Sequence, residues 1–277
     1  MNIIKWAGGK GKLVEPLAKL ILPKLTEEAT YIEPFLGSGA LFFHLRRNGF
    51  EGRALLADTN VNLVFMWRAI QNYPEAVFAQ LQTLPLDIEE ARDEYYNVRA
   101  AFNANINKPD ETQTLNAARF IWLNRMCFNG LYRVNKSGEF NVPLGSYKTV
   151  ALPNLEDLLE HSRMLRGAKL VVRDFEMTFD YVSPGDVLYA DPPYVPLTPT
   201  ADFTSYTSEG FNAAKQEKLA ELAWAARLKG VSVVLSNHDL SYVRDLYKNW
   251  TVDSLLVRRS ISREGSNRAG VYEAIIY

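Results

Sequence analysis

Residues 30–47 read TYIEPFLGSGALFFHLRR, a short apolar segment followed by a glycine-containing turn and an amphipathic stretch. Aliphatic and aromatic residues over 30–33 favour a β-strand, and the apolar spacing over 40–47 favours a helix. Gly37 and Gly39 lie between them, where glycine lets the backbone approach a ligand and leaves helix N–H groups pointing at it. The stretch therefore predicts a strand–turn–helix unit with a ligand at its turn.

Similar short apolar segments alternate with helical patterns through much of the chain. The expected strands are residues 30–33, 53–57, 169–173, 186–190, 231–236, 252–257 and 271–277, and the expected core helices are 13–21, 39–47 and 213–228. Strands that alternate with helices predict an α/β fold, with a mainly parallel sheet covered on both faces. The last two strands are about a dozen polar residues apart, too few for a crossover helix, so we expect an antiparallel C-terminal hairpin.

Residues 61–165 break this alternation, because four helical patterns follow one another without a buried-strand pattern between them. The expected helices are 63–71, 74–84, 89–103 and 113–128, with a polar loop over 103–110. We expect a mostly helical insertion between the second and third core strands. Residues 1–60 and 166–277 would then form one domain, and residues 61–165 a second.

Composition limits the possible functions. The chain has 277 residues, 47% hydrophobic and 23% charged, which is typical of a globular protein with a sizeable core. The net charge of −1 gives no global positive field, so a nucleic-acid partner would need local basic patches. The N-terminal residues lack the apolar core of a signal peptide, and no apolar run approaches about 18 residues. A cytoplasmic protein without a membrane partner is expected.

Metal chemistry is not indicated by the cysteines or histidines. Cys127 is the sole cysteine, which excludes internal disulfides and a cysteine-based metal cluster. His44, His161 and His238 are scattered without metal-ligand spacing, so each is expected to be a surface or packing residue.

Residues 188–194, LYADPPY, form a second chemical feature at the end of an expected strand. Adjacent prolines lack backbone N–H groups and restrict the residues before them, so this turn is stiff. We expect it to present carbonyl oxygens with no competing donors, beside the Asp191 carboxylate and the Tyr194 ring. These groups suit a planar substrate that carries an NH₂ group.

The glycine-containing turn suits an adenosine-containing ligand. The next strand ends at Asp58, about twenty residues on, where a carboxylate can bind ribose hydroxyls; an ordinary tight turn with a helix-capping Asp58 is the alternative. The glycines and lysines of residues 5–12 invite comparison with the phosphate-loop motif G-x-x-x-x-G-K-S/T. The full motif is absent, because Leu13 rather than Ser or Thr follows Lys12, so a phosphate loop is disfavoured. A lysine and a flat ring there fit a carboxylate-bearing ligand without phosphates.

Together these motifs resemble those of the Dam-type (D12 class) DNA adenine-N6 methyltransferases, along the whole chain. The matching motifs, in the family's order, are KWAGGK (5–10), EPFLGSG (33–39), Asp58, RDF (173–175) and DPPY (191–194). The family's target-recognition segment and two C-terminal motifs are matched by NRMCFNGLYRVNKSGEFNVPLGSY (124–147), SNHD (236–239) and VRRSIS (257–262).

The resemblance implies a Rossmann-like S-adenosylmethionine-dependent methyltransferase sheet, with a helical target-recognition domain inserted. S-adenosyl-L-methionine would be the methyl donor, S-adenosylhomocysteine the product, and no metal would be needed. By position, the cofactor residues would be Trp6, Lys10, Phe35, Gly37, Gly39, Asp58, Phe175 and Asp191. Asp174 could instead be a structural cap at a strand end.

The implied reaction is methyl transfer to adenine N6 in double-stranded DNA. The Asp191 carboxylate and the Pro192 carbonyl would accept the amine hydrogens and stabilise the developing positive charge, and Tyr194 would stack on the flipped-out base. Cys127 lies outside this motif and is expected to be a packing residue. The resemblance implies GATC as the target.

The implied DNA contacts lie mainly in residues 124–147. Arg133 would read a guanine in the major groove, and Phe128 would be a wedge between bases. The remaining contacts would be Lys5, Asn129, Leu131, Asn135, Pro143 and Tyr147. Basic residues there are interleaved with aromatic ones, namely Arg119, Arg125, Arg133 and Lys136 with Trp122, Phe128 and Tyr132.

Arginines also crowd the segment between the last two expected strands. Arg258 and Arg259, together with Arg263 and Arg268, suit a phosphate clamp, while a solvated charged hairpin is the alternative.

Two other functions are weighed against this interpretation. One is methylation of another amino group, such as cytosine N4 in DNA or adenine in RNA; Asp rather than Ser or Asn at 191 argues against it. The other is a DNA-binding protein without activity, which the intact 191–194 motif argues against. A bacterial or phage protein with this chemistry could serve restriction–modification, mismatch repair, DNA replication or phage defence, with no obligate protein partner.

Overall fold

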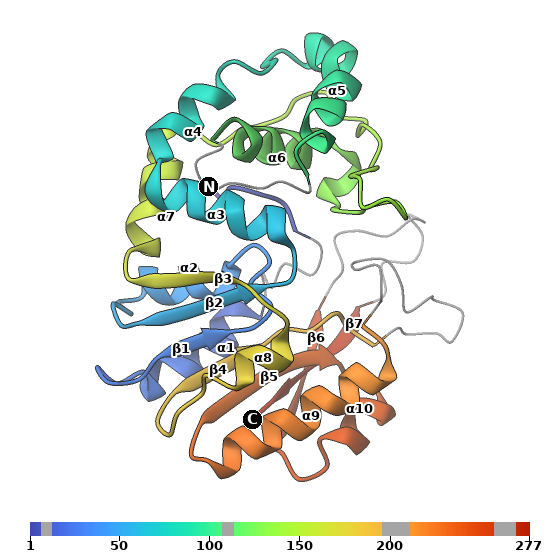
Figure 1. Cartoon of the computed structure of the whole chain (residues 1–277). Helices are drawn as coiled ribbons and strands as arrows, with labels where there is room; N and C mark the ends of the chain where they lie inside the picture. The colour runs from blue at the N-terminus through green and yellow to red at the C-terminus, as the bar shows by residue number, and fades with distance from the viewer. Residues whose placement is uncertain (7–12, 107–113, 196–210, 258–269) are drawn as a thin grey trace. The chain divides into compact units, whose positions relative to one another are not determined.

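The computed structural model describes residues 1–6, 13–106, 114–195, 211–257 and 270–277 (Figure 1). The helices are α1 (Val14–Ile21), η1 (Leu22–Lys24), α2 (Ala40–Arg47), α3 (Val61–Asn72), α4 (Pro74–Leu81), α5 (Ile88–Asn103), α6 (Thr114–Met126), η2 (Phe128–Gly130), α7 (Leu155–Leu165), α8 (Phe175–Phe179), α9 (Ala213–Leu228) and α10 (Ser241–Leu246). The strands are β1 (Tyr31–Glu33), β2 (Ala54–Asp58), β3 (Ala168–Val172), β4 (Val187–Ala190), β5 (Ser232–His238), β6 (Val252–Val257) and β7 (Val271–Ile276).

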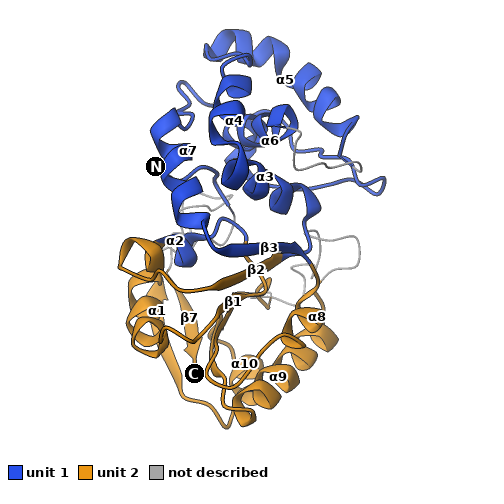
Figure 2. Cartoon of the chain, turned by 60° about the vertical axis from the view of Figure 1, so that its left-hand side comes forward, with its two compact units in different colours: residues 1–9, 37–43, 58–172 blue, residues 10–36, 44–57, 173–277 orange. Residues whose placement is uncertain are grey.

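The chain forms two compact units, coloured separately in Figure 2. Unit 1 contains residues 1–9, 37–43 and 58–172, and unit 2 contains residues 10–36, 44–57 and 173–277. Each unit contains three stretches of the chain. For example, β1 belongs to unit 2, whereas the glycine-containing turn that follows it belongs to unit 1.

The strands form a seven-stranded sheet in the order β3-β2-β1-β4-β5-β7-β6. β1 pairs in parallel with β2 and β4, and β4 pairs in parallel with β5. β7 is antiparallel to both β5 and β6. The mixed α/β fold, its mainly parallel sheet and the antiparallel C-terminal hairpin are therefore confirmed.

Unit 2 buries its central strands between helices. All residues of β4 are buried, as an apolar strand requires when both faces of the sheet are covered. Leu17 and Ile21 of α1 and Leu219 and Ala223 of α9 are buried as well. Figure 2 shows α1 on one side of these strands and α8, α9 and α10 on the other.

Unit 1 is mainly helical and is built around α6. From Ala117 to Met126 nearly every residue of α6 is buried, since α3, α4 and α5 all pack against it. Trp122 donates from Nε1 to the Pro85 carbonyl at 2.8 Å, and the Tyr95 hydroxyl donates to the Val142 carbonyl at 2.9 Å. These bonds satisfy the polar ends of two large side chains inside an apolar core.

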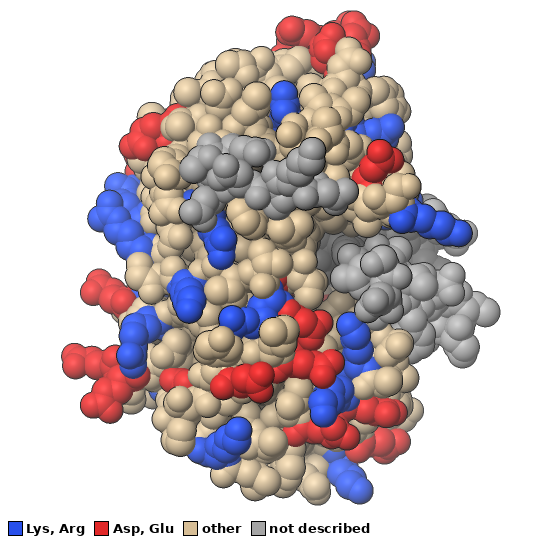
Figure 3. All heavy atoms as spheres, viewed as in Figure 1, with Lys and Arg blue, Asp and Glu red and all other residues tan. Residues whose placement is uncertain are grey.

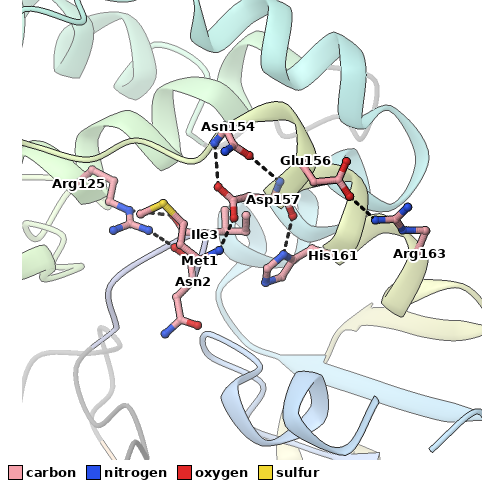
Figure 4. Close-up of polar contacts among 9 residues, drawn as sticks. All are labelled: Met1, Asn2, Ile3, Arg125, Asn154, Glu156, Asp157, His161 and Arg163. Carbon is pink, nitrogen blue, oxygen red and sulfur yellow. Dashed lines mark hydrogen bonds and ion pairs between the residues drawn. The ribbon is translucent and has the colours of Figure 1, made fainter. Parts of the chain in front are cut away.

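Three α-helices were not expected individually: α7, α8 and α10. The first is capped by a reciprocal pair, since Asn154 accepts the N–H of Asp157 and Asp157 accepts the N–H of Asn154 (Figure 4). The helix expected over 113–128 ends earlier, at Met126, because the backbone of Cys127 is extended, with φ −72° and ψ 162°. No described helix is long and apolar enough to cross a membrane.

Candidate active site

Asp191 follows β4 directly, and its carboxylate is held by a buried hydroxyl. Ser236 of β5 donates from Oγ to Asp191 Oδ1 at 2.8 Å. The Tyr189 hydroxyl lies 2.9 Å from the same Ser236 Oγ. The predicted catalytic carboxylate thus lies at the carboxyl end of a parallel strand, where sites of α/β sheets are commonly built.

The diproline turn after Asp191 is braced by amide side chains. Gln216 donates from Nε2 to the Pro193 carbonyl at 2.8 Å, and Asn237 Nδ2 donates to Gln216 Oε1 at 3.1 Å. The Val195 N–H in turn donates to Asn237 Oδ1 at 3.2 Å. These bonds hold the turn from two sides.

One expectation about this turn is wrong in part. The Pro193 carbonyl already accepts from Gln216 Nε2 at 2.8 Å, so a substrate amine would meet a competing donor there. For the Pro192 carbonyl, the described residues provide no hydrogen-bond donor. Of the two proline carbonyls, Pro192 is therefore the one suited to accept from a substrate.

Tyr194 is fixed at both ends of its side chain. Its hydroxyl donates to Glu273 Oε2 at 3.2 Å, and its ring meets the edge of His238 with centroids 4.8 Å apart. Burial raises the pKa of the Tyr194 phenol well above its ordinary value, and the nearby Asp191 charge adds to the shift. The side chain is accordingly a neutral, immobilised ring.

Three phenylalanine rings of unit 2 form a cluster. Phe35, just after β1, stacks on Phe175 with centroids 5.5 Å apart and an interplanar angle of 25°. Phe211 meets the edge of Phe35 at 5.6 Å and also contacts Phe175 at 5.5 Å. Phe35 and Phe175 were expected in the cofactor site, whereas nothing in the local sequence around Phe211 distinguishes it from other aromatic residues.

The glycine-containing turn closes onto Trp6 within unit 1. Gly37 and Gly39 have left-handed φ values of 49° and 66°. A Cβ atom at Gly37 would lie 2.9 Å from both Cδ1 and Nε1 of Trp6, closer than van der Waals contact permits. Trp67 donates from Nε1 to the Gly37 carbonyl at 3.1 Å. Glycine is therefore required here for both conformation and space.

Asp58 binds this same turn. Its Oδ2 accepts the Gly37 N–H at 3.0 Å and its Oδ1 accepts the Asn60 N–H at 2.8 Å. Burial raises the pKa of Asp58, although these N–H donors act in the opposite direction. The alternative of a helix-capping Asp58 is wrong, because Asn60 caps α3 through the Leu63 N–H at 3.1 Å.

Asp174, in contrast, is a structural cap. It is the N-cap of α8 and accepts the Glu176 N–H at 3.0 Å. Its carboxylate also lies 3.8 Å from the Lys215 ammonium group.

Asn124 of α6 joins the N-terminal segment to the expected base-reading turn. Its Oδ1 accepts the Lys5 N–H at 2.7 Å, and its Nδ2 donates to the carbonyls of Lys5 at 2.7 Å and Gly130 at 3.1 Å. Asn124 is only 4% exposed, so these three bonds satisfy most of its hydrogen-bonding capacity. The backbone of Lys5 is thereby fixed beside η2.

Arg125, the next residue of α6, binds backbone rather than facing solvent. Its guanidinium group donates to the Ile3 carbonyl at 3.0 Å and to the Asn2 carbonyl (Figure 4). Arg125 is 7% exposed and Trp122 is fully buried. The interleaved basic and aromatic pattern of α6 therefore arises partly from the core of unit 1.

Lys5 and Tyr147 lie side by side next to η2. The Lys5 ammonium is 4.2 Å from the centre of the Tyr147 ring, and the Tyr147 hydroxyl donates to the Cys127 carbonyl at 3.0 Å. Burial, together with the neighbouring charge of Arg125, lowers the pKa of Lys5. Burial also raises the pKa of the Cys127 thiol to about 12, which agrees with a packing role for this cysteine.

Residues 133–141 form a short hairpin. The Asn141 N–H donates to the Arg133 carbonyl at 3.0 Å, and Arg133 Nε donates to Asn141 Oδ1 at 2.7 Å. Asn135 Oδ1 accepts the N–H groups of Ser137 and Glu139, and its Nδ2 donates to Glu139 Oε2 at 2.8 Å. The Asn135 side chain thus builds the turn that presents the exposed Arg133.

The other expected DNA contacts surround η2. Phe128 is 44% exposed, a large ring left open to solvent, and its N–H donates to the Pro143 carbonyl at 2.9 Å. Leu131 follows η2 and is half-buried. Three predicted site residues, Lys10, Arg258 and Arg259, lie outside the described residues.

Charged side chains of both signs occur on the same face of the molecule (Figure 3). On the face in Figure 3, the coloured basic and acidic side chains are interspersed rather than separated by sign. Within the described part of the chain, no group of three or more His, Cys, Asp or Glu residues could hold a metal ion. His161 and His238 are buried packing residues.

Comparison with known proteins shows the family. The model of the D12 class N6 adenine-specific DNA methyltransferases matches residues 6–261. The type II methyltransferase M.MjaIII of Methanocaldococcus jannaschii is 36% identical over 99% of this chain and 97% of its own length. DNA adenine methylases of Vibrio cholerae and Escherichia coli K12 are 35% and 33% identical, each over 98% of this chain and 94% and 93% of their own lengths. The chain is therefore a DNA adenine-specific methyltransferase that belongs to the D12 class.

Proposed function

We propose that this methyltransferase uses S-adenosyl-L-methionine to methylate N6 of an adenine flipped out of double-stranded DNA, within the sequence GATC. The observation that carries the proposal is Asp191, held by Ser236 at 2.8 Å and followed by a braced diproline turn. Asp191 and Pro192 are adjacent in the chain, so in this proposal the carboxylate and the Pro192 carbonyl act as two acceptors for one amine.

The chemistry follows from the nature of the amine. The lone pair of adenine N6 is delocalised into the ring, so the nitrogen is a poor nucleophile. Hydrogen bonds from its N–H groups to Asp191 and to the Pro192 carbonyl favour a tetrahedral nitrogen and stabilise the positive charge that develops on it. These acceptors act through electrostatics, and Cys127 takes no part in the reaction.

The base must leave the DNA stack to reach these acceptors, which costs a few kcal/mol. The Tyr194 ring, already fixed by Glu273 and His238, offers a stacking surface that returns about 1–3 kcal/mol. Because the ring is held in place, little side-chain entropy is lost when the base stacks on it.

Each unit, taken by itself, contains residues whose chemistry suits a part of S-adenosylmethionine. Trp6 lies so close to Gly37 that no side chain fits at position 37. Because Gly37 has none, the backbone of this turn can approach a ligand closely. Asp58 provides acceptors for ribose hydroxyls. Phe35, which is half-buried, lines the cradle and stacks on Phe175, the residue expected near the cofactor adenine. Lys10, Gly39, Phe175 and Asp191 complete the proposed set. Once bound, the cofactor supplies the methyl group.

DNA reading belongs mainly to the helical insertion in this proposal. Residues 1–60 and 166–277 form the catalytic domain, and residues 61–165 form the target-recognition domain. Arg133, presented by its hairpin, reads a guanine, and Phe128 inserts as a wedge. The further contacts are Lys5, Asn129, Leu131, Asn135, Pro143, Tyr147, Arg258 and Arg259.

The proposal is tested by methylating a plasmid with the purified protein and mapping modified bases at single-base resolution. N6-methyladenine confined to GATC is the expected result. Another adenine-containing motif would contradict the site and leave the chemistry intact. N4-methylcytosine, or methylation of RNA only, would contradict the substrate.

Two variants separate catalysis from base reading. Asp191→Ala should abolish methyl transfer while DNA binding stays measurable, because the carboxylate acts on the amine and not on the duplex. Arg133→Ala should retain methyl transfer but lose about 1–3 kcal/mol of discrimination at one base pair. Near-normal turnover by Asp191→Ala would refute the assigned role.

A further inference from the structure

Two buried hydroxyl groups form a polar chain that ends on Asp191. Ser236 Oγ donates to Asp191 Oδ1 at 2.8 Å, and the Tyr189 hydroxyl lies 2.9 Å from Ser236 Oγ. A serine hydroxyl has a single proton to donate. Since Ser236 gives that proton to Asp191, Tyr189 must donate to Ser236, and both hydrogen bonds are directed toward the carboxylate.

The strand register brings the three side chains together. β4 and β5 are parallel neighbours, with Tyr189 opposite Val234 and Ala190 opposite Leu235. Asp191 and Ser236 are the next residues after this last pair. Tyr189 and Asp191 are two positions apart, so their side chains project from the same face of the sheet. Ser236 is consequently within reach of both.

Neither hydroxyl is accessible to solvent. Ser236 is 0% exposed and Tyr189 is 1% exposed, so water does not replace a bond that is lost. Burial raises the pKa of the Tyr189 phenol well above its ordinary value, and the Asp191 charge adds to the shift. Tyr189 therefore keeps the proton that it donates to Ser236 throughout the usual assay range.

The neighbouring carboxylates have other donors. Glu33 accepts from the Tyr31 hydroxyl at 2.9 Å, and Glu273 accepts from the Tyr194 hydroxyl at 3.2 Å. Each of these two acidic groups of unit 2 is thus held by a hydroxyl from a strand or from the turn after β4. Ser236 is the hydroxyl that holds the carboxylate next to the diproline turn.

We propose that Ser236, itself oriented by Tyr189, is a positioning residue that fixes the rotation of the Asp191 carboxylate and so aligns it with the substrate amine. This inference rests on the proposed function of Asp191. A carboxylate on a single methylene can rotate about its bonds, and a bond to one of its oxygens sets the plane of the group. Catalytic alignment of this kind is lost with small displacements of the acceptor.

Ser236→Ala should lower the rate of methyl transfer in a single turnover by about 10- to 100-fold, the range expected when a hydrogen bond to a charged group is removed. The dissociation constants for DNA and for S-adenosylmethionine should change less than about twofold, because Ser236 is fully buried and is not among the residues proposed to bind either one. Tyr189→Phe should give a smaller decrease in rate, since Ser236 keeps its bond to Asp191.

Two further variants distinguish positioning from general support of the fold. Ser236→Thr keeps the hydroxyl and should restore most of the rate. Ser162→Ala is the matched control: Ser162 of α7 is also buried, and its Oγ donates to the Gln71 carbonyl at 2.9 Å. Its loss should leave the single-turnover rate unchanged. If Ser236→Ala does not fold, the other two variants test the positioning role. A decreased rate for Tyr189→Phe, with most of the wild-type rate for Ser236→Thr, would support it, and an unchanged rate for Tyr189→Phe would contradict it.

The outcomes separate this inference from the proposed function. A wild-type protein that forms no N6-methyladenine overturns the function itself. A wild type that methylates, with Asp191→Ala inactive but Ser236→Ala at the wild-type rate, overturns only the positioning role. The positioning role is also overturned if Ser236→Thr is as slow as Ser236→Ala. It is overturned as well if Ser236→Ala lowers the rate of methyl transfer and the affinities for DNA and S-adenosylmethionine together.

Discussion

The Asp58 carboxylate accepts a hydrogen bond from the Gly37 N–H at 3.0 Å, across 21 positions of sequence. Through this bond, the residue that ends β2 holds the turn that follows β1. The same carboxylate accepts the Asn60 N–H at 2.8 Å. Asp58 therefore shapes the backbone of the proposed cofactor site as well as offering acceptors to a ligand.

The first prediction concerns pH. Burial raises the pKa of Asp58, so the folded state binds its proton more tightly than the unfolded state does. The contribution of Asp58 to the free energy of unfolding must then decrease as pH rises from about 4 through the folded pKa. Asp58→Asn cannot titrate. Urea unfolding of both proteins between about pH 4 and pH 7 should show wild type losing stability relative to Asp58→Asn; a constant difference would contradict the shift.

Gly37→Ala should be more harmful than an ordinary glycine substitution. At φ 49° the alanine is strained, and its Cβ would also lie 2.9 Å from the Trp6 ring. The strain alone costs about 1–2 kcal/mol, and the clash must displace Trp6 from its stacking on Tyr132, with centroids 6.0 Å apart. Unfolding free energy and cofactor affinity should both decrease.

Gly167→Ala is the control for that experiment. Gly167 has φ 74°, and no atom lies within 4 Å of the position that an alanine methyl would take, so this variant suffers the strain without the clash. It should lose stability but keep its affinity for S-adenosylmethionine. Equal losses of affinity in both variants would show that close contact between Gly37 and Trp6 has no role in binding.

The sheet could be predicted from sequence because its signals are local. Each strand is a short apolar segment bounded by turn residues, and the short connection between β6 and β7 requires an antiparallel pair. The helices α8 and α10 span only 5 and 6 residues, too few to show a helical period. Their boundaries depend on tertiary contacts that the sequence does not display.

The candidate site could be predicted only where a motif is contiguous. Asp191, Pro192 and Tyr194 are adjacent in sequence, whereas Phe211 reaches Phe35 from a distant part of the chain. Arg125 illustrates the opposite error: a basic residue among aromatic ones resembles a DNA contact, yet its guanidinium group binds the carbonyls of residues 2 and 3. Charge type alone does not separate a solvent-facing arginine from one that satisfies buried backbone.

Asn124 should control both the stability and the DNA affinity of unit 1. Asn124→Ala leaves the Lys5 N–H without its acceptor and removes the donor to the Lys5 and Gly130 carbonyls, which should cost about 1–3 kcal/mol. Because these bonds hold η2 beside Lys5, affinity for the specific site should decrease more than affinity for random DNA. Urea unfolding and binding titrations would measure the two effects.

Two comparisons sharpen the Asn124 experiment. Asn124→Asp can still accept the Lys5 N–H but cannot donate to either carbonyl. Its free energy of unfolding should lie between those of wild type and Asn124→Ala, or below both if the new carboxylate is buried as an unpaired charge. Asn97→Ala on the exposed face of α5 removes only a bond to Glu94 at 3.0 Å and should be nearly neutral. Similar behaviour of Asn97→Ala and Asn124→Ala would show that the three buried bonds do not hold the turn.

The last prediction separates a phosphate clamp from a solvated loop at Arg258 and Arg259. Each arginine that contacts a DNA phosphate adds about 0.9 to the slope of log affinity against log salt, through counterion release. The double variant Arg258→Ala/Arg259→Ala should therefore lower the magnitude of this slope by about 2. Lys229→Ala/Lys248→Ala removes the same charge from two exposed residues of the described part of the chain and should leave the slope near its wild-type value. Because both double variants change the net charge equally, a difference between their slopes can arise only from direct phosphate contacts; equal slopes would favour the solvated loop.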